Sequence, residues 1–326
     1  MKSIEHYWYN PNVLVWLLLP LSWLFCLVSF IRRKFYQCDL KKSFQAEAPV
    51  IVIGNIVAGG SGKTPLLIAL CEYLEAKGYK PGVVSRGYGG SVAGVHQVLP
   101  NDDATLVGDE PLMINQRTNV PVVVGVDRVA AIDHLLVNNQ CNVVLSDDGL
   151  QHYRMKRDYE IAVVDSVRKF GNGFCLPAGP LRERLSRLKD VNLVVYSGVE
   201  QPESQQCSYN LKTTEIVKLA TKEVKAMSFF EGKLIHAVAG IGSPERFFSQ
   251  LKAQELDIVE HAFPDHHSYI QTDFSGWDQA CIIMTEKDAV KCRHLNLEDA
   301  WVLVVSAEMS RALENSLNST LIPLLD

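Results

Sequence analysis

Residues 50–64 limit the possible folds of this chain more than any other segment. Four apolar β-branched residues at 50–53 precede a glycine-rich stretch that closes on Gly62-Lys63-Thr64, and a helix-like apolar pattern starts directly afterwards. A strand, a glycine loop and the start of a helix, in this order, predict a phosphate-binding P-loop. The first glycine position of the usual motif holds Val57 here. The alternative is an ordinary glycine turn between a strand and a helix.

The P-loop prediction assigns a nucleotide site and its cofactors. Backbone N–H groups of such a loop surround phosphate oxygens, and the helix N-terminus adds a partial positive charge. Lys63 would reach the β- and γ-phosphates of ATP, and the Thr64 hydroxyl would hold Mg²⁺. The predicted nucleotide-binding residues are Ala58, Gly59, Gly60, Ser61, Gly62, Lys63, Thr64 and Pro65.

The composition bounds the class of protein. With 326 residues, 47% of them hydrophobic, the chain has enough material for a membrane anchor and two folded domains. A net charge of −5 and a pI near 6.0 give no support for nucleic-acid binding. The eight cysteines form no Cys-x-x-Cys pair, which argues against a zinc or redox motif and suits a reducing, cytosolic location.

The N-terminal region contains a long apolar segment. Residues 13–31 carry no charge, and as a helix they would extend about 28 Å, close to the thickness of a bilayer's hydrocarbon core. Three aromatic residues at 7–9 precede the segment, and Arg32, Arg33 and Lys34 follow it. This pattern predicts a membrane helix with the rest of the chain in the cytoplasm. A buried helix of a soluble protein and a helix lying in the membrane interface are the alternatives.

The rest of the chain alternates between strand-like and helix-like segments. Strands are expected at 50–54, 81–85, 120–125, 142–146, 159–164 and 192–196, with helices at 64–77, 109–116 and 128–138. Such alternation predicts a parallel sheet with helices on both faces. Later strands are expected at 234–239, 281–284 and 301–305, a helix opens at Pro244, and the residues from 307 onward look helical.

We therefore predict an α/β fold with an N-terminal apolar helix, a P-loop-containing parallel-sheet domain and a second, smaller α/β domain. The expected divisions are a membrane-anchoring helix at 1–35, a P-loop kinase-like domain at 36–205, a β-rich linker at 206–230 and the smaller domain at 231–326.

Two acidic residues end one of the expected strands. Asp147 and Asp148 follow the apolar run at 142–146, which is where a P-loop fold places its Mg²⁺-binding carboxylate. Gln151 and His152 come directly afterwards and are suited to orient water, phosphate or substrate. The alternative is a plain turn followed by a solvent-facing loop.

Other polar segments also follow predicted strands or open predicted helices. Arg86 and Tyr88 lie in a glycine-rich loop that could contact phosphate or could be a flexible turn. Asp109 is either a helix cap or a base that takes a proton from an attacking hydroxyl. In the segment 179–185, Arg182 would clamp an anion and Glu183 would join the metal shell, or the segment is a solvated helix start.

The second domain contributes two further polar motifs. His266 and His267 are adjacent, and in an extended chain they would point in opposite directions, so joint metal binding is disfavoured. One histidine assisting a carboxylate is the preferred interpretation. The segment 285–291 reads as a capped helix start.

Taken together, these motifs resemble those of the tetraacyldisaccharide 4'-kinase family, the lipid A 4'-kinases of Gram-negative bacteria. The resemblance covers essentially the whole chain. It rests on Gly54-Asn55, Gly59-Gly60-Ser61-Gly62-Lys63-Thr64-Pro65, Ser85-Arg86-Gly87-Tyr88-Gly89, Gly108-Asp109-Glu110-Pro111, Val126-Asp127-Arg128, Asp147-Asp148-Gly149-Leu150-Gln151-His152, Gly179-Pro180-Leu181-Arg182-Glu183 and Asp265-His266-His267.

The resemblance implies an activity and a location. The family transfers the γ-phosphate of ATP to the 4'-hydroxyl of a tetraacyldisaccharide 1-phosphate, giving lipid IVA in lipid A biosynthesis. The implied partners are this lipid substrate and the membrane, with no nucleic acid and no obligate protein partner. The implied location is the bacterial inner membrane, with the catalytic domains on its cytoplasmic face.

The resemblance also implies a role for each motif. Asp109 would be the catalytic base, paired with His266, and Lys63 would act on the phosphates. The implied metal-side residues are Thr64, Asp147, Asp148 and Glu183. The residues implied to line the substrate site are Arg86, Tyr88, Arg128, Gln151, His152 and Arg182. We also expect the second domain to close over ATP and bring His266 to Asp109.

Two other functions would fit a tethered P-loop protein. One is a membrane-bound nucleotide switch that regulates a protein partner, although such ATPases often have a lysine where this chain has Ala58. The other is a kinase for a soluble small molecule, which the apolar segment at 13–31 disfavours.

Overall fold

The computed structural model of the chain describes residues 4–10, 13–200, 202–277 and 280–326. Its strands are β1 (Val50–Gly54), β2 (Pro81–Ser85), β3 (Val95–Gln97), β4 (Val122–Gly125), β5 (Val143–Asp147), β6 (Tyr159–Asp165), β7 (Leu193–Ser197), β8 (Ser208–Lys218), β9 (Val224–Lys225), β10 (Leu234–Ala239), β11 (Asp257–Ala262), β12 (Cys281–Thr285) and β13 (Ala300–Met309).

The α-helices are α1 (Ile4–Tyr9), α2 (Val13–Gln37), α3 (Lys63–Ala76), α4 (Ala104–Val107), α5 (Asp109–Thr118), α6 (Arg128–Asn138), α7 (Pro244–Lys252), α8 (Glu286–Cys292), α9 (Arg311–Ser316) and α10 (Ile322–Leu325). Short 3₁₀ turns occur at Leu185–Lys189, Met227–Phe230 and Gln271–Phe274, and a π-helical turn at Leu317–Leu321 joins α9 to α10.

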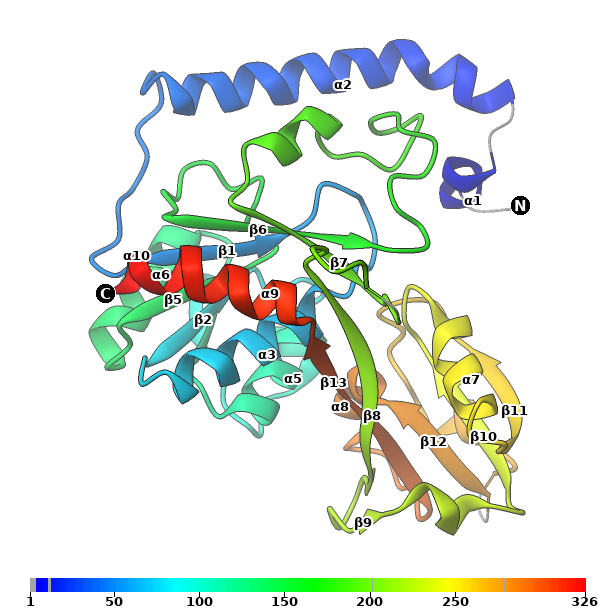
Figure 1. Cartoon of the computed structure of the whole chain (residues 1–326). Helices are drawn as coiled ribbons and strands as arrows, with labels where there is room; N and C mark the ends of the chain where they lie inside the picture. Colours follow the sequence, from blue (N-terminus) through cyan, green and yellow to red (C-terminus); the bar gives the residue numbers. More distant parts are fainter. Residues whose placement is uncertain (1–3, 11–12, 201, 278–279) are drawn as a thin grey trace.

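The described strands form one continuous sheet. The order is β11-β10-β12-β13-β8-β7-β6-β1-β5-β2-β4-β3, with β9 paired to β8 outside this path. Strands β7, β6, β1, β5, β2 and β4 run parallel and make up a first half, and β11, β10, β12 and β13 run parallel in a second half. The α/β fold and its N-terminal apolar helix are confirmed (Figure 1).

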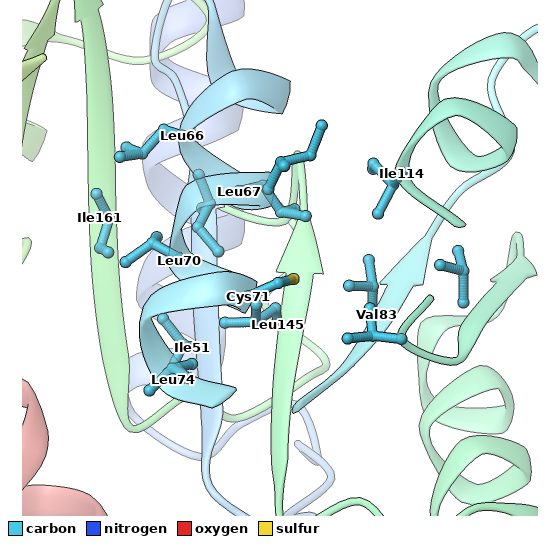
Figure 2. Packing of buried hydrophobic residues seen from close by; sticks show 14 of the residues in the cluster. Ile51, Leu66, Leu67, Leu70, Cys71, Leu74, Val83, Ile114, Leu145 and Ile161 are labelled. Atoms are coloured by element: carbon cyan, nitrogen blue, oxygen red, sulfur yellow. The ribbon is translucent and has the colours of Figure 1, made fainter. Parts of the chain in front are cut away.

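Hydrophobic layers cover both faces of the first half. Because side chains alternate along a strand, Ile51 points to one face of β1 and Val52 to the other. Ile51 packs with Leu70 of α3 and with Leu145 of β5, as Figure 2 shows. Val52 belongs to a second cluster that includes Leu135 of α6. The P-loop helix is therefore fixed against the centre of the sheet.

Strand β8 connects the two halves directly. It pairs in parallel with the end of β7 and antiparallel with the whole of β13, with a bulge between Val304 and Val305. The predicted β-rich segment at 206–230 is thus largely a strand of the sheet. The division of the chain into domains at 36–205, 206–230 and 231–326 stays a prediction.

The C-terminal helices return to the first half. Leu313, Leu317 and Leu321 are fully buried in the same cluster as α3, and Tyr73 of α3 donates a hydrogen bond of 2.8 Å to Asn318. In Figure 1 these helices lie beside α3, away from the second half. The prediction that the chain turns helical at Ala307 is wrong by a few residues, because β13 continues to Met309 to complete its pairing with β8.

Helix α2 lies along the outside of the first half rather than projecting away from it (Figure 1). Ser22 donates a hydrogen bond of 2.7 Å to the carbonyl of Cys175, and Arg33 pairs with Asp190 at 2.8 Å. By length and hydropathy, residues 15–37 meet the requirements of a membrane span. The opposite face exposes a continuous set of large apolar side chains, Val13, Trp16, Leu17, Leu21, Trp23, Leu24, Leu27, Val28, Phe30, Ile31 and Phe35.

A disulfide also joins α2 to the first half. It links Cys26 to Cys175, whose Cα atoms are 6.3 Å apart. This pairing differs from the expectation of a reducing environment, in which both residues would be thiols. The cysteine spacing gave no sign of it, because the two residues are 149 positions apart in the chain.

Candidate active site

A cleft of about 1310 Å³ lies where the two halves of the sheet meet. Its walls come from the P-loop, from the carboxyl ends of β2 and β5, from the face of α2 that includes Phe25 and Arg32, and from α7 and α8 of the second half. A parallel α/β sheet offers ligand sites at the carboxyl ends of its strands, and this cleft occupies that edge.

Residues that follow much later in the chain donate hydrogen bonds to carbonyl groups of the P-loop and fix its conformation. Gly62 has a φ of 78°, and a Cβ atom there would lie 2.5 Å from the hydroxyl of Tyr209, so only glycine fits this position. Tyr209 donates a hydrogen bond to the carbonyl of Gly62, and Ser197 donates one of 3.0 Å to the carbonyl of Ser61. The sequences of β7 and β8 contain no pattern that predicts these contacts with the P-loop.

The predicted phosphate-binding residues divide into two groups. Gly59, Gly60, Ser61, Gly62, Lys63, Thr64 and Pro65 all line the cleft. Ala58 does not, and its N–H donates a hydrogen bond of 2.7 Å to the carbonyl of Pro180. The backbone donor of Ala58 is therefore already occupied within the protein.

Asp147 and Asp148 end β5 beside the P-loop, as predicted. Asp148 Oδ1 lies 3.6 Å from Lys63 Nζ, and Asp148 Oδ2 accepts a hydrogen bond of 2.9 Å from Arg182. Burial opposes the ionisation of Asp148, but the charges of Lys63 and Arg182 outweigh it and lower the pKa to about 2. This carboxylate is anionic at any physiological pH.

Asp147 is the more deeply buried of the two acids. Its Oδ2 accepts a hydrogen bond of 3.1 Å from Ser85, while its Oδ1 has no hydrogen-bond partner among the described residues. Burial, helped by the charge of Glu110, raises the pKa of Asp147 to about 6. An unpartnered buried carboxylate oxygen facing a cleft is available to a cation.

Glu183 belongs to a hydrogen-bonded network next to these acids. It accepts hydrogen bonds from Gln151, at 3.1 Å, and from Tyr153. Gln151 in turn accepts one of 3.5 Å from Arg182, which connects Glu183 to Asp148. Arg182, Gln151 and Glu183 all line the cleft, as expected.

A set of cationic and neutral donors forms another wall. Arg128 is buried, donates a hydrogen bond of 2.8 Å to the carbonyl of Asp147, and leaves its Nη1 without a partner among the described residues. His152 lies close by, and burial together with the charge of Arg128 lowers its pKa to about 4, so its imidazole is neutral. Arg86 and the exposed Tyr88 complete this wall.

The carboxylate–histidine pair expected from the sequence is present. His266 Nδ1 donates a hydrogen bond of 3.0 Å to Asp109 Oδ2, across the interface between the halves. The bond raises the pKa of His266 above its usual value. Burial opposes the ionisation of Asp109, yet the same bond and the charge of Lys287 lower its pKa. The pair is already formed in this structure, so it requires no further movement of the second half.

The two adjacent histidines have separate partners. His266 has a φ of 61°, an uncommon conformation for a non-glycine residue, and it faces Asp109 and Tyr88. His267 instead lies 2.9 Å from Asp273, within the second half. The two side chains do have separate partners, but they reach them through a turn at 265–266 and not through the extended chain that the prediction assumed.

Several residues of the second half that the sequence did not single out also line the cleft. Arg246 of α7 pairs with Asp165 at the end of β6, and Gly242 lies against Gly60 of the P-loop. Lys287 of α8 approaches Asp109. Their roles depend on contacts between segments far apart in the chain, which no local pattern records.

The site fits a divalent cation bound together with a nucleotide. Among the described residues, no three acidic, histidine or cysteine side chains converge on one point. Mg²⁺ in nucleotide sites usually takes only one or two protein carboxylates and receives its other ligands from phosphates and water. The free oxygen of Asp147, Asp148 and the Thr64 hydroxyl match that requirement.

Residues 14–322 match the model of the family described as tetraacyldisaccharide-1-P 4'-kinase. A tetraacyldisaccharide 4'-kinase from Nitrosococcus oceani is 48% identical over 94% of this chain and 90% of the relative. One from Hahella chejuensis is 45% identical over 95% of this chain and 93% of the relative.

The fold also matches a solved structure, the "apo" form of LpxK from Aquifex aeolicus in complex with ATP. The TM-score is 0.82 with 26% sequence identity, over 96% of this chain and all of the other. The chain belongs to the tetraacyldisaccharide-1-P 4'-kinase family.

Proposed function

We propose that this chain is an ATP-dependent kinase that phosphorylates the 4'-hydroxyl of tetraacyldisaccharide 1-phosphate, a lipid A precursor. The observation that carries the proposal is the Asp109–His266 pair, at 3.0 Å, whose histidine lines the same cleft as the P-loop while the carboxylate lies buried behind it. A P-loop alone would serve any nucleotide-binding protein. A carboxylate held by a histidine beside it supplies the base that phosphorylation of a hydroxyl requires.

The P-loop residues position the donor. Backbone groups of residues 59–62 and the N-terminus of α3 face the phosphates of ATP, and Lys63 neutralises charge on the β- and γ-phosphates. Thr64, Asp147 and Asp148 would hold Mg²⁺, with Glu183 beside them, and the ion would neutralise the phosphate charge. Phosphoryl transfer depends mainly on such positioning and charge neutralisation.

Asp109 accepts the proton during transfer. The 4'-hydroxyl oxygen forms a bond to the γ-phosphorus as the bond from that phosphorus to the β–γ bridging oxygen breaks. The hydroxyl proton moves to Asp109, and ADP leaves. His266 orients the carboxylate by donating from Nδ1 to Oδ2, and the N–H of Glu110 donates a hydrogen bond of 2.9 Å to Oδ1.

The acceptor occupies the part of the cleft that arginine side chains line next to the P-loop. Arg86, Arg128 and Arg182 offer guanidinium groups to its anionic and hydroxyl groups, while Tyr88, Gln151 and neutral His152 offer hydrogen bonds. Phe25 and Val28 of α2 give this part of the cleft an apolar border, as a lipid acceptor requires.

The exposed apolar face of helix α2 supports a location of the enzyme at the cytoplasmic face of the bacterial inner membrane. One face packs on the protein through Val15, Ser22 and Cys26, and the other exposes apolar side chains. A helix covered on one side by its own domain suits insertion into one leaflet rather than a full crossing. The cleft then opens at the lipid surface where the acceptor resides.

The proposed activity is tested by following labelled phosphate from ATP to tetraacyldisaccharide 1-phosphate in detergent with Mg²⁺. Wild type should transfer phosphate, and Lys63→Ala and Asp109→Ala should lose most of this activity. ATP hydrolysis without lipid phosphorylation would favour a membrane-tethered nucleotide switch. Equal transfer to a lipid-free acceptor would favour a kinase for soluble substrates.

A further inference from the structure

Lys287 is a buried cation at the centre of an acidic group. Its Nζ lies 3.0 Å from Asp265 Oδ1, 3.2 Å from Glu110 Oε1 and 3.9 Å from Asp109 Oδ2, and its side chain is only 14% exposed. These acids come from two elements, α5 and the loop that carries His266. A single ammonium group therefore ties the carboxylate of the base to the loop of its histidine partner.

The position of Lys287 is itself firmly fixed. The hydroxyl of Thr285 caps α8 by accepting from the N–H of Asp288, and Glu286 accepts a hydrogen bond of 2.6 Å from Arg117 of α5. Lys287 thus sits between two anchored neighbours and reaches the cleft from a helix start packed against α5. Its contact with Asp109 follows from the packing of α8 on α5.

We propose that Lys287 is a positioning residue for phosphate transfer, which holds Asp109 against the loop of His266 and favours the anionic carboxylate and the neutral imidazole. This inference rests on the proposed function of the cleft. Removal of the ammonium group would leave three carboxylates close together, and like charges at such distances favour protonation of one of them. A protonated Asp109 cannot accept the proton of the hydroxyl.

The charges around the pair support this assignment. The groups that face Asp109 and His266 are Glu110 on α5, Asp265 on the histidine loop, Lys287 and Lys291 on α8, and Tyr88 on the loop after β2. The charge of Lys287 lowers the pKa of Asp109 and opposes the rise in the pKa of His266. Burial opposes the charge of Lys287, but Glu110, Asp109 and Asp265 together raise its pKa, so it stays protonated.

The test compares the pH dependence of kcat/KM for wild type, Lys287→Met, Lys287→Arg and Arg293→Met. Lys287→Met keeps the aliphatic stem and removes the charge. Arg293→Met is the matched control, because it removes a cation that bonds Gln116 of α5 from the opposite end of α8, away from Lys287 and Asp109. Thermal unfolding followed by circular dichroism shows which variants fold.

We expect Lys287→Met to shift the acid limb of the profile upward by about one pH unit, which lowers kcat/KM by about tenfold at pH values below the wild-type limb. Lys287→Arg should restore the wild-type limb, and Arg293→Met should keep it. A uniform loss at all pH values in Lys287→Met, or no rescue by arginine, would overturn the proposal.

A second measurement is independent of catalysis. Titration of the His266 imidazole by NMR should give a higher pKa in Lys287→Met than in wild type. If wild type transfers no phosphate but this pKa still rises, the proposed function fails while the linkage between Lys287 and the pair stands. An unchanged pKa of His266 would overturn the inference whatever the activity.

Discussion

Arg246 and Asp165 join the two halves of the molecule next to the P-loop. Arg246 Nη1 lies 2.8 Å from Asp165 Oδ2, and Nη2 donates a hydrogen bond of 2.9 Å to Oδ1. Asp165 ends β6 in the first half, and Arg246 lies in the first turn of α7 in the second. Because a planar guanidinium matches a carboxylate with two parallel bonds, this pair fixes the orientation of the halves as well as their separation.

Breaking this pair should loosen the nucleotide end of the cleft. We expect Arg246→Ala to raise the KM for ATP about tenfold and to cost about 1–2 kcal/mol of stability, a modest amount because the arginine is partly exposed. A double-mutant cycle with Asp165→Asn measures the coupling by urea unfolding in detergent. Additive single effects would show that the pair does not hold the halves together.

Separate substitution of the two adjacent histidines tests which of them takes part in phosphate transfer. His266→Ala should lower kcat by about 100- to 1000-fold, because it removes the group that orients Asp109. His267→Ala loses only a contact with Asp273, so it should keep activity close to wild type. Transfer assays at saturating ATP and lipid check both. Similar rates in the two variants would remove His266 from the mechanism.

The pair also predicts the pH dependence of wild type. Since the pKa of His266 is raised above 6.5, its proton persists to higher pH than in a free imidazole. The protonated imidazole stabilises the anionic form of Asp109 and weakens it as a base. The rate should therefore fall as the pH drops through a value above 6.5, and rise again on return to alkaline buffer. An acid limb below the usual range of an aspartic acid would mean that Asp109 alone titrates.

We expect the Mg²⁺ dependence of phosphate transfer to rest mainly on Asp148. Asp148→Asn leaves Lys63 and Arg182 without their anionic partner, so we expect kcat/KM to fall about 100-fold and the Mg²⁺ requirement to rise. Asp190→Asn, which alters an acid paired with Arg33, is the control. EDTA should abolish transfer and Mg²⁺ should restore it. Full activity of wild type in EDTA would exclude the predicted role of the ion.

The exposed face of α2 should control membrane binding. Leu17, Leu21 and Leu24 are 71%, 55% and 57% exposed, so their replacement by serine should not unfold the protein. Each change should weaken sedimentation with phospholipid vesicles by about tenfold, given the free energy of burying a leucine side chain. Leu99→Ser, also at an exposed leucine but outside α2, is the control. Unchanged sedimentation of the triple variant would place the membrane contact elsewhere.

Much of the first half could be predicted from the sequence, since its signals are local. The bounds of β1, β2 and α6 agree with their predicted ranges, because buried β-branched runs and apolar helical periodicity identify such elements. Most of the site residues follow strand ends, so the parallel sheet brought them to one edge. The predicted positions of Asp147, Asp148 and the P-loop agree with the structure because all of them follow strand ends at the same edge of the sheet.

The remaining features depend on contacts between distant segments. Strand β8 is interrupted by polar residues and reads as irregular, and only its pairing with β13 makes it a strand. The role of Lys287 arises from the packing of α8 on α5, and the disulfide of Cys26 arises from the position of α2. No window of sequence contains both members of any of these pairs.

The return of α9 and α10 to the first half has a consequence for biogenesis. Leu313, Leu317 and Leu321 complete a hydrophobic layer whose other members are made long before them. On the ribosome, the P-loop helix therefore emerges with its apolar flank uncovered and keeps it so throughout translation of the second half. A chain that lacks the last two helices would expose this flank of α3, so the stability of the P-loop helix depends on residues made at the end of synthesis.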